Sequence, residues 1–122
     1  MTAAASSIAA QLDKNAGAAG DAVWLISPDT GTTVTWGAAR DAAREIAVQL
    51  DALGLAPGAP VAVAAQNSIW STLCFTGITT GGYLATPLNL VAGARVLSYV
   101  LRHSGAGLVL CTDEQRDMVE AV

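Results

Sequence analysis

The pattern of apolar and polar positions is clearest between residues 36 and 53. Apolar side chains recur there at intervals of four, three, four and three residues, which places them along one face of a helix. These positions are Ala39, Ala43, Ile46, Leu50 and Leu53. Thr35 can cap the amino end of this helix, and Gly54 followed by Pro57 can end it. The pattern therefore predicts an amphipathic helix that buries one face.

Short apolar runs on both sides of this helix predict strands. The segments 22–26 and 32–35 flank a Ser-Pro-Asp-Thr-Gly turn and predict an antiparallel β-hairpin. Three later runs predict buried strands, namely 60–65, 83–87 and 108–111. The segments between and after them predict helices, namely 68–80 capped by Asn67, 93–103, and a last one capped by Asp113 that reaches Met118.

The order of these elements determines the expected fold class. Strands and helices alternate, which is typical of an α/β fold with right-handed crossovers. We therefore expect a mainly parallel sheet with helices on both faces, plus the N-terminal β-hairpin. Residues 1–20 are rich in Ala, Ser and Gly and predict a short helix followed by a flexible stretch. Residues 21–122 are then expected to form one domain, for which the chain is long enough.

The composition argues against several classes of protein. Hydrophobic residues make up 52% of the chain and charged residues 13%, compared with about 25% charged residues in an average domain. This balance disfavours intrinsic disorder, and a net charge of −4 without a basic cluster disfavours nucleic-acid binding.

Residues 52–94 carry no charge, and the segment 69–88 within them is long enough to span a bilayer. Its threonines, glycines and Pro87 favour a buried helix and strand, so no membrane span is expected.

The chain lacks the short motifs that carry chemistry. It contains no G-x-G-x-x-G, no G-x-x-x-x-G-K-[ST] and no G-x-S-x-G sequence. Segment 79–82 has the composition of a phosphate loop, but it stands where a helix should end and so predicts a turn. A helix amino end explains Asp113, Glu114 and Asp117, and a helix carboxyl end explains His103. No catalytic, cofactor-binding or metal-binding residue is therefore predicted.

The cysteines and the start of the chain bear on the compartment. The first residues lack the basic and long apolar regions of a secretory signal. In such a chain, Cys74 and Cys111 are better explained as buried thiols than as a disulfide. We therefore expect a cytoplasmic protein.

Five fragments, in this order, resemble the opening of the adenylate-forming acyl-CoA synthetases, a family of AMP-binding acid–CoA ligases. They are T-V-T-W at 33–36, L-D-A-L-G-L-A-P-G at 50–58 with V-A-V at 61–63, N-S at 67–68, G-Y-L-A-T-P-L-N at 82–89, and L-R-H-S-G-A at 101–106 with L-V-L and Asp113. The resemblance covers residues 23–113 and implies the N-terminal part of that family's large AMP-binding domain. Four places depart from the family's usual pattern: Ala38, Gly58-Ala59-Pro60, Thr80 and Leu90.

The resemblance also implies an activity and its cofactors. Such ligases, known from fatty acid metabolism, activate a carboxylic acid with ATP and Mg as its acyl-AMP and pass it to CoA. Their Lys-ending phosphate loop, Tyr-Gly-x-Thr-Glu segment and catalytic Lys do not occur in this sequence. The chain is therefore interpreted as an N-terminal ligase fragment that is not competent alone.

The alternative interpretation is a stand-alone truncated homologue that acts as an interaction or dimerisation module. In both cases the apolar composition predicts a surface that needs cover. The expected partner is the remainder of the ligase's large domain or another copy of the chain.

Overall fold

The computed structural model describes residues 7–122, and its elements follow the predicted order. The first half contains α1 (Ile8–Ala19), β1 (Val23–Ile26), β2 (Thr33–Thr35), α2 (Trp36–Ala52) and β3 (Pro60–Ala64). The second half contains α3 (Ile69–Thr80), β4 (Leu84–Pro87), the 3-10 turn η1 (Leu90–Ala92), α4 (Ala94–Ser104), β5 (Val109–Cys111), the 3-10 turn η2 (Asp113–Gln115) and α5 (Arg116–Ala121).

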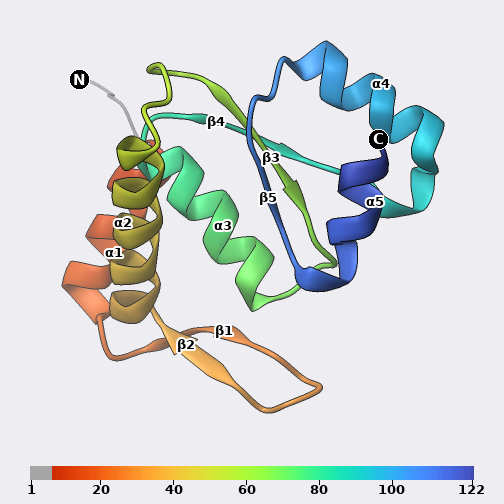
Figure 1. The fold of residues 1–122 in the computed structure, drawn as a ribbon. Helices are drawn as coiled ribbons and strands as arrows, with labels where there is room; N and C mark the ends of the chain where they lie inside the picture. The colour runs from red at the N-terminus through yellow and green to blue at the C-terminus, as the bar shows by residue number, and fades with distance from the viewer. Residues whose placement is uncertain (1–6) are drawn as a thin grey trace.

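The main sheet has three parallel strands in the order β4-β3-β5, and the hairpin β1-β2 forms a separate antiparallel sheet. Figure 1 shows α2 and α3 on one side of the three-stranded sheet and α4 and α5 on the other. The predicted α/β class, with helices on both faces and an N-terminal hairpin, is confirmed. None of the helices within residues 7–122 is long and apolar enough to cross a membrane.

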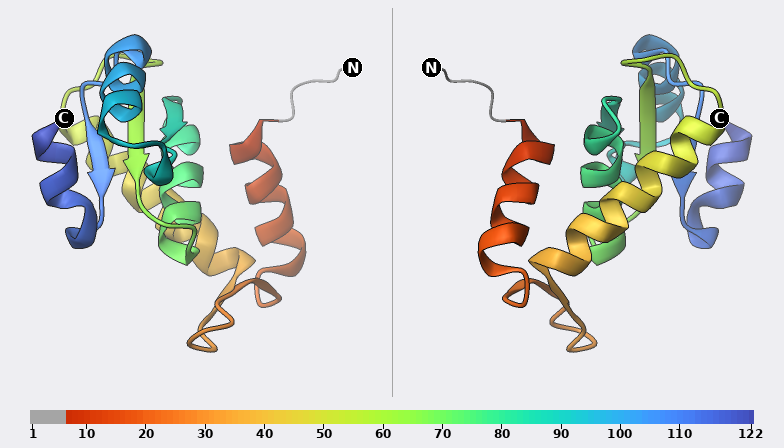
Figure 2. Two further views of the ribbon diagram at one scale, coloured as in Figure 1. Left: turned by 90° about the vertical axis from the view of Figure 1, so that its right-hand side faces the viewer. Right: turned by 90° about the vertical axis from the view of Figure 1, so that its left-hand side faces the viewer.

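The central strand β3 is buried on both faces, which explains its uncharged sequence. Its side chains alternate between the two faces, as they do in any strand. Val61 and Val63 enter the core formed with α2 and α3, whereas Ala62 and Ala64 enter the core formed with α4 and α5. Figure 2 shows the same two helical layers from the sides. β3 therefore joins two separate hydrophobic cores.

The helix α1 and the hairpin add a third cluster on the outer side of α2. Leu12 is buried against Ala39 and Ala43, and Trp24 stacks on Trp36 with ring centroids 4.5 Å apart. The helix continues through residues 16–19, which the sequence assigned to a flexible stretch, and Ala16 is buried within it.

Two predicted helix caps are wrong. The amino end of α3 is capped by Ser68 and not by Asn67, because Ser68 and Ser71 accept hydrogen bonds from each other's backbone N–H. This reciprocal capping box requires a polar side chain three residues after the cap, a place that Trp70 would hold for Asn67. Asp113 lies inside η2, and its carboxylate pairs with Arg116.

The predicted ends of α2 are correct. The Thr35 hydroxyl accepts the backbone N–H of Ala38 at 3.1 Å. Gly54 has a φ of +77°, a left-handed conformation that glycine adopts without steric cost after a helix. These two local signals place α2, which carries the apolar face that contacts α3.

The helices α2 and α3 approach each other most closely at Gly77. A Cβ atom on Gly77 would lie only 2.6 Å from Cβ and from Cγ2 of Ile46. Alanine at this position therefore cannot be placed without moving one helix.

We expect Gly77→Ala to lower the free energy of unfolding by about 1–3 kcal/mol, because overpacking outweighs the roughly 1 kcal/mol gain in helix propensity. Gly17→Ala is the matched control, since Gly17 lies in α1 and a Cβ there would meet no atom within 4 Å. It should stabilise by up to about 1 kcal/mol. Urea unfolding of both variants measures the difference, and equal effects would contradict the close α2–α3 contact.

Candidate functional site

A cavity of about 230 Å³ opens where the carboxyl ends of β3 and β4 meet the amino end of α3. Because β4 and β5 lie on opposite sides of β3, the strand order reverses between β3 and β5, on the side of β3 away from β4. Open parallel sheets bind ligands at the carboxyl ends of their strands at such a reversal. The cavity is lined by Val63, Ala65, Asn67, Ser71, Thr72, Phe75, Pro87 and Leu88. It lies at the same carboxyl-end edge of the sheet but on the β4 side of β3, and is taken as the candidate site.

The polar groups of this cavity are mostly engaged within α3 itself. The hydroxyls of Ser71 and Thr72 each donate to the backbone carbonyl of Ser68 at 3.0 Å. The lining includes no acidic, basic, His or Cys side chain. The cavity could therefore contact a ligand through its apolar walls and the Asn67 amide, but its lining contains no general acid or base.

The Thr-Thr-Gly-Gly segment lies at the opposite end of α3. The backbone N–H of Gly81 donates to the carbonyl of Gly77, and that of Gly82 donates to the carbonyl of Thr79. These amides therefore form the last hydrogen bonds of the helix and are not available to a ligand. Gly82 has a φ of +82°. The predicted turn is confirmed, and this segment is separate from the cavity.

Thr80, within this turn, has a buried hydroxyl with no hydrogen-bond partner in residues 7–122. We expect Thr80→Val to raise the free energy of unfolding by about 1 kcal/mol, because a methyl group replaces an unsatisfied polar atom. Thr76→Val is the control, since the Thr76 hydroxyl donates to the Leu73 carbonyl at 3.0 Å. It should show no gain. Chemical unfolding distinguishes the two, and a loss of stability in Thr80→Val would show that its hydroxyl has a partner.

The remaining titratable groups do not assemble into a reaction centre. The Tyr83 hydroxyl donates to the Asp51 carboxylate, and this hydrogen bond raises the pKa of Tyr83. The His103 ring stacks on Tyr99 with centroids 5.4 Å apart. Within residues 7–122, no group of three His, Cys, Asp or Glu side chains comes close enough to hold a metal ion. The Tyr83–Asp51 contact ties the turn after α3 to α2.

Both cysteines are free thiols in this structure; Cys74 is buried, as predicted, whereas Cys111 is only half-buried. Cys74 belongs to the core formed with α2 and α3, whereas Cys111 packs with the core on the other face of the sheet. Burial raises the pKa of the Cys74 thiol to about 11. This thiol is therefore a core group and not a nucleophile at neutral pH.

The burial of Cys74 predicts a loss of stability in alkaline solution. The unfolded thiol ionises near pH 9.0 and the folded thiol near 11, so its contribution is complete below pH 9 and declines between the two values. Urea unfolding at pH 8 and pH 10 should show a smaller pH effect in Cys74→Ala than in the native chain. At pH 8, iodoacetamide should modify Cys111 before Cys74. Equal alkylation of both thiols in the folded chain would contradict the burial argument.

Sequence reasoning did not locate the cavity. Its lining comes from the ends of β3, β4 and α3, and their meeting depends on the strand order β4-β3-β5. Hydrophobic periodicity identifies strands but carries no information on their order. The one usable signal was the polar pair Asn67-Ser68, which comes shortly after a buried strand.

The fold and the cavity define an open parallel α/β domain. Comparison with known proteins gives the family: the sequence profile of AMP-binding enzymes matches residues 12–122. The chain therefore belongs to the family of AMP-binding enzymes.

Individual relatives agree with this family. A sulfoacetate–CoA ligase from Cupriavidus necator is 33% identical over 89 residues, which cover 73% of this chain and 18% of that protein. A long-chain-fatty-acid–CoA ligase from Mycobacterium tuberculosis is 29% identical over 97 residues, or 80% of this chain and 19% of that protein. The chain thus spans about a fifth of the length of these relatives.

Solved structures show the same arrangement. The N-terminal domain of FACL13 from Mycobacterium tuberculosis superposes with a TM-score of 0.89 and 26% identity, over 97% of this chain and 30% of that chain. The folded unit described here is therefore one part of a larger domain in that protein.

Proposed function

We propose that the chain is the N-terminal part of the large AMP-binding domain of a carboxylic acid–CoA ligase. The observation that carries this proposal is the family match over residues 12–122 together with two CoA-ligase relatives. The whole ligase would use ATP and Mg to form an acyl-adenylate and then transfer the acyl group to CoA in the cytoplasm. Residues 21–122 would belong to this domain, and α1, within the N-terminal segment 1–20, would be a helical extension that packs on it.

In such a ligase this region would act as scaffold. The cavity at the ends of β3 and β4 would contribute part of a wall and no acid or base, since its lining includes neither. Its Ser71 and Thr72 hydroxyls already donate to the Ser68 carbonyl within α3. Stabilisation of the phosphate charge would come from groups elsewhere in the enzyme. The chain alone would then bind none of the three cofactors productively.

We expect the purified chain to show no carboxylate-dependent exchange of pyrophosphate into ATP, because its sequence lacks the Lys-ending phosphate loop and the catalytic Lys. A hybrid that carries residues 12–122 in place of the aligned segment of the Mycobacterium tuberculosis ligase should show exchange. The matched control is the same hybrid with Gly77→Ala, which should lose thermal stability. Exchange by the chain alone above a mock preparation would refute the fragment proposal, and a folded but inactive hybrid would refute the ligase assignment.

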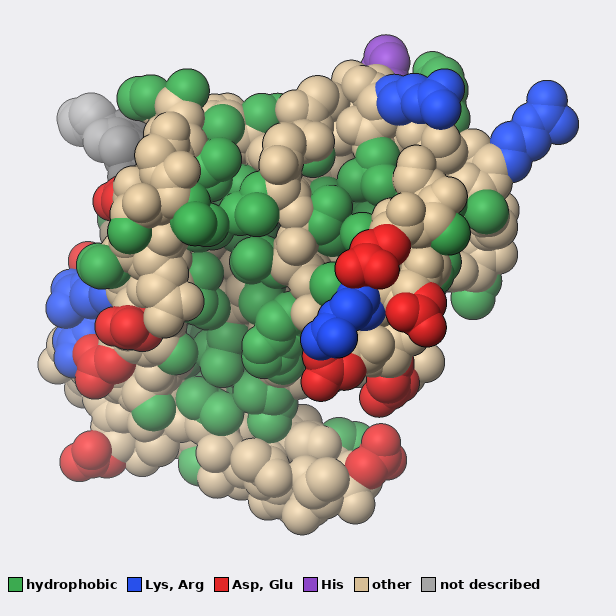
Figure 3. Space-filling view, in the orientation of Figure 1, with side chains coloured by type: hydrophobic (Ala, Val, Ile, Leu, Met, Phe, Trp, Pro, Cys, Tyr) green, Lys and Arg blue, Asp and Glu red, His purple; other side chains and the backbone are tan. Residues whose placement is uncertain are grey.

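A second candidate function is a stand-alone interaction module. It is favoured by the hydrophobic side chains that gather on one face of the molecule. Figure 3 shows them between α2 and α5, where α3 and β5 run. Trp70 contributes to the exposed apolar surface with 41% of its area accessible. A surface of this kind commonly marks a protein interface.

A further inference from the structure

A second pocket, of about 300 Å³, lies between α1 and α3 beside the stacked tryptophans. Figure 2 shows α1 and α3 side by side, with the hairpin below them. The pocket is lined by Ile8, Gln11, Leu12, Asn15, Trp24, Trp36, Thr72, Phe75 and Thr76. Its walls therefore come from α1, β1, α2 and α3, and its volume lies within the usual range of small-molecule sites.

The aromatic wall of this pocket is held in place by the hairpin. Trp24 lies in β1 and Trp36 begins α2, and their rings are parallel to within 12°. The backbone N–H of Trp36 donates to the Ala22 carbonyl at 3.0 Å, which fixes the start of the hairpin against the start of α2. Phe75 adds a third aromatic ring from α3. Because aromatic rings attract one another in stacked and edge-to-face contacts, this wall suits an aromatic ligand.

The polar groups that remain for a ligand come from α1. The hydroxyls of Thr72 and Thr76 donate to backbone carbonyls within α3 at 3.0 Å, so they need no partner in the pocket. The Gln11 amide donates to the Asn15 side-chain carbonyl, also at 3.0 Å. Within residues 7–122, the Gln11 carbonyl and the Asn15 N–H groups keep their capacity for a ligand. One acceptor and one donor group therefore lie on successive turns of the same helix.

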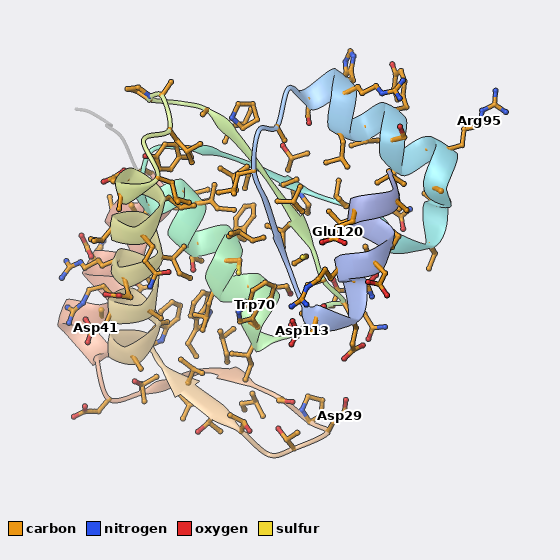
Figure 4. The ribbon with its side chains drawn as sticks, in the orientation of Figure 1. Asp29, Asp41, Trp70, Arg95, Asp113 and Glu120 are labelled. Atoms are coloured by element: carbon orange, nitrogen blue, oxygen red, sulfur yellow. The ribbon has the colours of Figure 1, made fainter. Side chains whose placement is uncertain are left out.

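The lining of this pocket, within the described residues, carries no charge. Asp13, which lies on α1 between the two amides in sequence, pairs with Arg44 of α2 at 2.9 Å. Figure 4 shows Asp29 at the tip of the hairpin, at the opposite end from α1. A charged ligand in the pocket would lose its hydration without gaining an ionic partner. The pocket therefore favours a neutral molecule.

We propose that this pocket is a binding site for a neutral aromatic molecule that carries one carboxamide group. Its ring packs against Trp24, Trp36 and Phe75. Its carboxamide accepts a hydrogen bond from the Asn15 amide and donates one to the Gln11 carbonyl, so all three amides are satisfied. The bound molecule contacts α1, β1, α2 and α3 together and so holds α1 against the rest of the domain.

This site goes beyond the proposed ligase function and does not depend on it. Thr72 and Phe75 also line the cavity at the ends of β3 and β4, so the pocket and the candidate site are neighbours along α3. The acid that a ligase activates carries a carboxylate, for which the pocket holds no cation. An amide and the corresponding acid should therefore bind this pocket differently.

Titration of the purified chain with benzamide, followed by tryptophan fluorescence, tests the site. We expect a saturable change, and benzoate, which has the same shape but carries a charge, should bind more weakly by at least about tenfold. Trp70→Phe should keep the change, because Trp70 lies near the amino end of α3 outside the pocket (Figure 4) and only Trp24 and Trp36 then remain. No binding, tighter binding of benzoate, or loss of the change in Trp70→Phe would overturn the proposal.

Two variants of α1 test the hydrogen bonds. Gln11→Ala should weaken benzamide binding by about three- to tenfold, because it removes the carbonyl that accepts from the carboxamide and the amide that orients Asn15. Lys14→Ala is the matched control, since Lys14 lies in the same helix and does not line the pocket. Both positions are exposed and alanine favours a helix, so both variants should fold. Equal affinities of the two variants would contradict the assigned contacts and overturn the proposal.

The site should also be present in a longer enzyme. A hybrid that carries residues 7–122 in place of the aligned segment of the Mycobacterium tuberculosis ligase should bind benzamide in a calorimetric titration as tightly as the chain alone. A folded hybrid without benzamide binding would show that another segment of the enzyme fills the pocket, and would overturn the proposal. A hybrid that binds benzamide but lacks pyrophosphate exchange would support the pocket and refute only the ligase assignment.

Discussion

The burial of β3 on both faces is the constraint on which the rest of the structure depends. A strand covered on both sides cannot carry a charge without a large desolvation cost, so residues 60–64 are uncharged. Its alternate side chains also differ in size, with valines facing α2 and α3 and alanines facing α4 and α5. The contact between α2 and α3 is also close, because a Cβ on Gly77 would meet the side chain of Ile46.

The sequence predicts most elements of this fold because local physics determines them. The apolar spacing of α2, its cap Thr35 and its terminating Gly54 are signals within a few residues of each other, and all three are correct. The cap of α3 was misplaced by one residue because Asn67 and Ser68 are both good caps. Only the position of Ser71 distinguishes them.

The candidate site could not be predicted in the same way. It depends on β4 lying beside β3 and on α3 covering their carboxyl ends, and the pattern of hydrophobic residues does not reveal which strands are neighbours. The residues that line the cavity are also ordinary in type, since Ser71 and Thr72 are explained by the local structure of α3. A site without titratable groups leaves no chemical signature in a single sequence.

The positions that depart from the family's pattern acquire a physical meaning in this structure. Ala59 packs at the margin of one core and Leu90 at the margin of the other, so two of these departures add apolar contacts within the region itself. Within residues 7–122, Thr80 leaves a buried hydroxyl unpaired, and Ala38 leaves the Thr35 cap without a reciprocal partner. The region thus gains packing at its two cores and loses polar contacts at its helix ends.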